Sequence, residues 1–360
     1  MTPEPAGACL GGRLMRRLGA ALVTAMIGAC ALAGCSGGGS DDSAAKPKPS
    51  ASSFTVESAL RELPPIEPSP DRPLQVFASD LAQASELGKL PKPRDPQSTA
   101  TWIQRLNGPE VYIAGGEGLG LPRLQTGAMR KALGFDARDI TTTSSVESLP
   151  DAVTVVHLAD GVSSKDVSTT GAGKIGDLDP AGASDAPFPQ VFGVARRDQQ
   201  IALAKTQKAL AAWRARGQRS LADHEPLLDV AKALGTHRVY DVVLSDRPAD
   251  AAFGGQLAEH MPATMPAFDA VGVAQAVEDG KAVEYIAYRV KDIAGAESRI
   301  RAVWEDDFAI RSNAWFAEIL DVEDVSTAGS VVTVKIAPTE SAGTAAQMLV
   351  LGDIPFIVPD

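Results

Sequence analysis

Residues 271–290 read VGVAQAVEDGKAVEYIAYRV, and this stretch decides the fold class. Asp279-Gly280 lies between two apolar runs that are rich in β-forming side chains. An Asp-Gly pair in that setting predicts a hairpin with a two-residue type I′ turn, because both central residues of such a turn need positive φ. The turn also sets the register and places Val273 opposite Ile286. An antiparallel hairpin is therefore expected here.

The order of hairpins and helices continues to the end of the chain. The expected elements are a helix with Ala296, Ile300, Val303 and Trp304 on one face, strands at 319–325 and 331–336, a helix at 342–351 and a strand at 356–358. In the second strand of that pair, Val332, Val334 and Ile336 alternate toward the core. The C-terminal part is thus predicted as β-β-α-β-β-α-β.

Strands and helices also alternate in the N-terminal part. The expected elements are a strand at 74–78, helices at 101–106 and 127–133, a buried strand at 152–158, hairpin strands at 191–195 and 201–205, and a helix from the N-cap Thr206 to Arg216. Residues 171–189 mix glycine and proline with polar residues and are expected to form a loop.

Ser220, Asp223, His224 and Glu225 resemble a metal or acid–base cluster at first sight. Ser220 and Asp223 stand three residues apart, directly before an apolar helical pattern that Gly235 closes. That spacing is typical of a capping box, with aspartate in the role of glutamate. We therefore interpret this group as structural.

Because strands occur in hairpins and not singly between helices, we predict an α+β fold class. It consists of two α+β halves built of hairpin-helix units with mainly antiparallel sheets, after a signal peptide and a flexible linker. The expected boundaries are 1–34 for the signal peptide, 35–73 for the lipidated cysteine and linker, 74–250 for the first domain and 266–360 for the second. Few residues repeat between the halves, which leaves a duplicated domain open.

Composition narrows the class of protein further. The chain has 360 residues, of which 44% are hydrophobic and 5% aromatic, and its formal charge is −11. This length and composition supply an ordinary core and exclude a collagen-like or wholly disordered chain. No basic stripe offsets the acidic excess, so we expect no nucleic acid among the partners.

The first residues are typical of an export signal. Arg13, Arg16 and Arg17 precede the uncharged run LGAALVTAMIGACALAG at 18–34, which is short for a membrane span. Met15 begins a compact version of this signal, and we expect translation to start there. A tether rich in serine, glycine and proline follows at 36–53.

The apolar run ends in Leu32-Ala33-Gly34-Cys35, which resembles the lipobox of bacterial lipoproteins. That resemblance implies cleavage between Gly34 and Cys35 and lipid attachment, through a diacylglyceryl group, to the Cys35 thiol. The other cysteines, Cys9 and Cys30, lie in the signal, so the mature chain has no disulfide and no thiol ligand set for a metal. Removal of 1–34 leaves 31 basic and 44 acidic residues and a charge of −13.

Two further segments, which lie in the body of the chain, also resemble a known family. LGFDARDI at 133–140 and SLADHEPLLDVAKALG at 220–235, with a hairpin followed by an alanine-rich helix containing a tryptophan, are similar to uncharacterised actinobacterial lipoproteins. The resemblance covers most of the mature chain. It implies a location at the cell membrane and no reaction.

Glycine-rich segments invite nucleotide-binding interpretations that their spacing does not support. After Gly116 and Gly118 the third glycine of a dinucleotide loop is missing, since Leu121 and Arg123 occupy its place. GAGKI at 171–175 likewise lacks the first glycine and the serine or threonine of a phosphate loop. We expect no cofactor.

Catalytic and metal groups are equally sparse. His157 with Asp160 and Ser163 is the only weak candidate for nucleophilic catalysis, and His224, His237 and His260 are scattered. The acidic runs at 305–307 and 321–324 lack the spacing of a calcium loop and are expected to be solvated. We assign no catalytic residue and no metal site.

The sequence therefore favours a lipoprotein that is anchored through Cys35 at the extracytoplasmic face of the cell membrane. We expect a non-enzymatic module that binds or supports an envelope protein or a small ligand. The alternatives are a solute-binding component of a transporter and a cell-envelope hydrolase. A transporter component favours two parallel α/β lobes, whereas hairpins dominate here.

Overall fold

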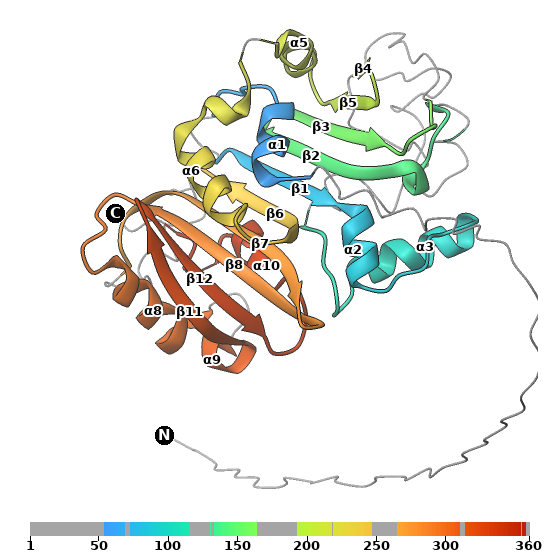
Figure 1. Ribbon diagram of the computed structural model, residues 1–360. Coiled ribbons are helices and arrows are strands. Elements are labelled where there is room, and N and C mark those ends of the chain that lie inside the picture. Colours follow the sequence, from blue (N-terminus) through green and yellow to red (C-terminus); the bar gives the residue numbers. More distant parts are fainter. Residues whose placement is uncertain are drawn as a thin grey trace, which may run out of the picture. The chain divides into compact units, whose positions relative to one another are not determined.

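One sheet of ten antiparallel strands runs through the protein, with helices on both of its faces (Figure 1). The computed structural model describes residues 54–68, 73–114, 130, 133–163, 193–217, 219–246, 265–309, 314–353 and 355–357. All of them belong to the unit Ala51–Asp360. Within these ranges, no helix has the length and hydropathy needed to cross a membrane.

The strand order in the sheet is β11-β12-β8-β7-β6-β1-β2-β3-β5-β4. The strands are β1 (Gln75–Asp80), β2 (Ile140–Ser148), β3 (Asp151–Leu158), β4 (Gly193–Arg197), β5 (Gln200–Ala204), β6 (Val239–Ser245), β7 (Phe268–Glu278), β8 (Lys281–Val290), β11 (Leu320–Ala328) and β12 (Val331–Pro338). A separate pair consists of β9 (Phe308–Ala309) and β10 (Ala314–Trp315). The predicted α+β class with mainly antiparallel strands is confirmed.

The strand order repeats on either side of the β1–β6 pair. Outward from this pair, the first five strands lie in the order β1, β2, β3, β5, β4, and the next five lie in the order β6, β7, β8, β12, β11. Strands β6 and β7 lie on either side of the predicted boundary between the domains 74–250 and 266–360, and they are themselves neighbours. The two predicted halves thus share one sheet.

One face of the sheet is covered by α1 (Val56–Glu62), α5 (Gln207–Ala215) and α6 (Glu225–Leu234). Their apolar side chains, among them Leu60, Trp213 and Val230, are buried against alternate residues of the strands. Thr206 caps α5 as predicted, since its side chain accepts a hydrogen bond from the Ala209 amide. Helix α1 lies inside the stretch that the sequence assigned to the linker.

The opposite face carries two further groups of helices. Helices α2 (Leu81–Leu87) and α3 (Pro96–Arg105) cover β2, β3 and β5, while α8 (Ala296–Asp306), α9 (Phe316–Ile319) and α10 (Thr344–Leu351) cover the strands of the second half. The predicted apolar face of α8 is buried. The repeat of strand order does not extend to the helices, because α5 and α10 lie on opposite faces.

The Asp-Gly hairpin has the predicted turn and register. Asp279 and Gly280 have φ values of 50° and 79°, and Val273 pairs with Ile286 across β7 and β8. The β11–β12 pair is confirmed as well, with Val334 and its inward neighbours fully buried.

The prediction of a terminal strand at 356–358 is wrong for Phe356 and Ile357, the two residues of it that the structure describes. Phe356 and Ile357 lie in bends, and both side chains are buried. The Phe356 ring packs edge-on against Trp304, with 5.7 Å between ring centroids, and stacks near Tyr288. Aromatic packing in the core, and not strand pairing, holds this end of the chain.

Candidate functional site

The residues on which the sequence placed lipid attachment lie outside the described residues. This applies to Cys35 and Gly34, and equally to the glycine-rich segments at 115–120 and 171–175. No structural statement about them follows, and the lipid anchor stays a prediction.

The histidines are engaged in separate structural contacts. His157 Nε2 lies 2.8 Å from a Glu62 carboxylate oxygen and 3.1 Å from Gln200 Nε2, so its partners are not Asp160 and Ser163. His224 Nε2 lies 3.2 Å from Asp246 Oδ2. The His237 ring stacks on Tyr285 with centroids 3.6 Å apart, and His260 is not among the described residues.

The predicted capping box is present in part. The Ser220 amide donates to Asp223 Oδ2 at 2.9 Å and closes a short 3-10 turn at Leu221–Asp223, after which α6 begins at Glu225. Across the part of the chain that the structure describes, no group of three His, Cys, Asp or Glu side chains is placed to hold a metal ion.

A row of polar side chains crosses the centre of the sheet. Ser79, Asp241, Gln275 and Glu284 are register partners on the successive strands β1, β6, β7 and β8, and all four are almost fully buried. Asp241 accepts hydrogen bonds from the Gln275 amide at 2.9 Å and the Ala114 backbone at 3.2 Å. This row has no access to a ligand.

Both acids of the row titrate abnormally. Burial raises the pKa of Asp241 to about 7, against the opposing hydrogen bonds from Ser79, Ala114 and Gln275. Burial also raises the pKa of Glu284 to about 7, although its carboxylate accepts hydrogen bonds from the first amides of α10. The row therefore couples the stability of the sheet to pH.

The surface feature best suited to binding is a groove along α3, opposite the α1–α6 face. A cavity of about 570 Å³ lies between α3 and the segment 90–95 that precedes it. Its floor consists of Leu90, Pro93 and Trp102. The Trp102 indole is only 7% exposed, and its N–H donates to Ser85 Oγ on α2 at 2.9 Å.

Local sequence explains why the wall of the groove is well defined. Two prolines, Pro91 and Pro93, restrict the φ of the segment. The segment then ends in a capping box, in which the Ser98 amide donates to Asp95 Oδ1 at 2.8 Å and the Asp95 amide donates to Ser98 Oγ at 3.0 Å. The hydrogen bonds from Ser98 lower the pKa of Asp95, so this carboxyl stays ionised as a cap.

Residues of the motif at 133–140 hold the segment 90–95 in place through hydrogen bonds. Arg138 donates to the Arg94 carbonyl at 2.9 Å and to both carboxylate oxygens of Asp136. Burial alone would raise the pKa of Asp136, but hydrogen bonds from Arg138 and Arg130 hold it well below its usual range. A charged network thus fixes the backbone from which Arg94 extends.

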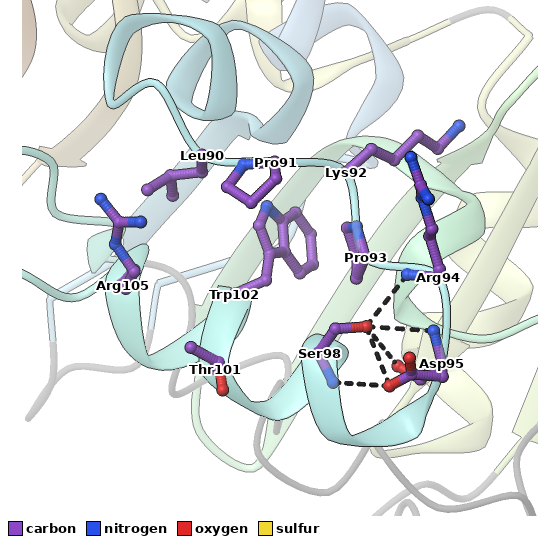
Figure 2. A pocket seen from close by; sticks show the side chains of 10 residues that line it. All are labelled: Leu90, Pro91, Lys92, Pro93, Arg94, Asp95, Ser98, Thr101, Trp102 and Arg105. Carbon is purple, nitrogen blue, oxygen red and sulfur yellow. Dashed lines mark hydrogen bonds between the residues drawn. The ribbon is translucent and has the colours of Figure 1, made fainter.

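Three cations rim the groove. Lys92, Arg94 and Arg105 are exposed, and no ion pair joins any of them to another residue in the described ranges. Figure 2 shows the Trp102 indole between Arg105 on one side and Lys92 and Arg94 on the other. Unpaired cations around an apolar floor bind anionic groups, because guanidinium and ammonium donors form charge-assisted hydrogen bonds.

The sequence prediction missed this groove. The available signal was the segment KLPKPRDP at 89–96, in which three basic residues alternate with prolines inside an acidic chain. Arg105 and Trp102 join it only through the folding of α3 back along the segment (Figure 2).

Comparisons with known proteins identified no relative of this chain. No protein-family model matches the chain. No curated protein and no solved structure matches it either.

Proposed function

We propose that the protein is a lipid-anchored extracytoplasmic lipoprotein whose folded part binds an anionic ligand in the groove along α3. In this proposal the Cys35 thiol carries a diacylglyceryl group, and cleavage after Gly34 makes Cys35 the first residue. The folded part acts by binding and not by chemistry.

The anchor is supported by the position of the lipobox. Leu32-Ala33-Gly34-Cys35 stands directly after an uncharged run with arginines before it, and Cys35 is the last cysteine of the chain. The mature charge of −13 opposes attraction to an anionic membrane surface, so the acyl chains hold the protein there.

The observation that carries the binding role is the set of cations around the Trp102 floor that form no ion pair with any residue the structure describes. Lys92 and Arg94 project from a segment that two prolines, a capping box and Arg138 hold in place. A site held rigid before the ligand arrives loses little entropy on binding. The antiparallel pairing of all strands in the sheet gives no support to the alternative of a two-lobed transporter component.

Metabolic labelling with a fatty-acid analogue tests the anchor. Wild-type protein is expected to take up the label and to fractionate with membranes, and Cys35→Ala is expected to lose the label. Cys30→Ala is the matched control, since it removes a cysteine of the signal and leaves the lipobox intact. Label that persists in Cys35→Ala, or its absence from the wild type, contradicts the anchor.

A further inference from the structure

We propose that the groove takes a linear ligand with two anionic groups, one at each end of α3, separated by an apolar stretch. This inference deepens the binding role proposed above and rests on it, but it does not depend on the lipid anchor. It concerns the chemical class of the ligand.

The groove extends along the whole of α3. Its cavity is lined at one end by Asp95, the residue before the helix, and at the other end by Arg105, the last residue of the helix. A helix of this size is about 15 Å long. A single small anion therefore contacts only one end.

The cations are divided between these two ends. Lys92 and Arg94 lie on one side of Trp102 and Arg105 lies on the other (Figure 2). Among the described residues that line the groove, Asp95 carries the only carboxylate, and its Oδ1 accepts a hydrogen bond from the Ser98 amide. The Arg105 end has no carboxylate among the described residues that line the groove, and at the other end two cations outnumber the single Asp95 carboxylate.

The surface between the two ends is mainly apolar, although Ser98 and Thr101 of α3 also line the cavity. Leu90, Pro91 and Trp102 line it, and the polar atom of Trp102 points to Ser85 instead of into the groove. A neutral, apolar spacer matches this surface, because it loses no hydrogen bonds to water on binding. A second carboxylate or phosphate in the middle of the ligand does not match it.

Two further cavities share lining residues with the groove. Arg105 also lines a cavity of about 560 Å³ that reaches Lys281 and Ala342 of the second half. Lys92 and Trp102 also line one of about 290 Å³ that reaches Arg138.

The probes are α,ω-dicarboxylates of increasing chain length, compared with monocarboxylates of the same length. Binding to the purified full chain in a non-ionic detergent is measured by calorimetry. Affinity is expected to peak for the diacid that spans about 15 Å and to exceed that of the matched monoacid about fivefold, as one added surface ion pair allows.

Substitutions assign the two ends. Arg105→Gln and Arg94→Gln are each expected to lower the affinity of the spanning diacid to that of the monoacid. Lys232→Gln, which removes an exposed cation of α6 on the opposite face, is the matched control and is expected to change nothing.

Each outcome bears on a different claim. Equal affinities of diacid and monoacid, both weakened by Arg94→Gln, overturn the two-ended ligand and leave the binding role intact. If the monoacid binds only when vesicles of anionic lipid are present, the two-ended ligand is overturned and the groove recognises a membrane surface instead. Binding of neither acid overturns the binding role itself.

Discussion

Ser79 on β1 and Asp241 on β6 face each other in the middle of the sheet, and the Ser79 hydroxyl donates a hydrogen bond of 2.6 Å to Asp241 Oδ1. The two residues lie 162 positions apart in the chain, and both are completely buried. They lie at the β1–β6 pair, where the repeated strand orders meet. A polar contact therefore marks the point at which the two halves of the sheet join.

Asp241→Asn is expected to change the pH dependence of stability. The pKa of Asp241 is about 7 in the folded protein and 3.8 in its reference state, so folding favours the protonated acid. This contribution to stability is complete below about pH 4 and is lost as the pH rises to about 7, by a few kcal/mol. Asparagine does not titrate. The free energy of unfolding of the variant is therefore expected to rise relative to that of the wild type as the pH increases from about 4 to about 7.

Urea unfolding between pH 4 and pH 8 measures this effect. Asp306→Asn, on an exposed position of α8, is the control and is expected to follow the wild type. A difference in unfolding free energy between Asp241→Asn and the wild type that stays constant with pH contradicts the assignment.

Gly280→Val is expected to destabilise the β7–β8 hairpin. Gly280 has a φ of 79°, a conformation that a β-branched side chain adopts at a cost of about 1–3 kcal/mol. Gly280→Asn is the matched control, since asparagine tolerates positive φ and should retain most of the stability. A melting temperature of Gly280→Val equal to that of the wild type contradicts the turn.

Gly272→Ala is expected to cost about 1–3 kcal/mol by overpacking. A Cβ atom at Gly272 on β7 would stand 2.5 Å from a Leu244 methyl and 2.8 Å from a Val230 methyl. Helix α6 thus packs on the sheet at a distance that only glycine permits. Gly217→Ala, where a Cβ meets nothing within 4 Å, is the control, and equal losses in the two variants rule out the packing argument.

Elements with a local signal could be predicted from the sequence. The turn at Asp279-Gly280, the cap of Thr206 and the apolar face of α8 each depend on neighbours in sequence, and all three are present. Local chemistry sufficed there because the turn and the helix ends fix their own hydrogen bonds.

Elements without such a signal were missed. Strand β2 reads ITTTSSVES and buries Ser144 and Ser145, although serine disfavours both strands and cores. In β6, Asp241 interrupts the apolar run, and its partners come from distant strands. The groove was missed for the same reason, because Arg105 and Lys92 come to line one groove only in the folded chain.

In the function proposed above, Cys35 anchors the protein as the first residue of the mature chain. Mass spectrometry of protein extracted from membranes tests it most directly. The expected N-terminal peptide begins at Cys35 and carries the mass of a diacylglyceryl group. A mature chain that begins at another residue, or an unmodified Cys35 thiol, would contradict it.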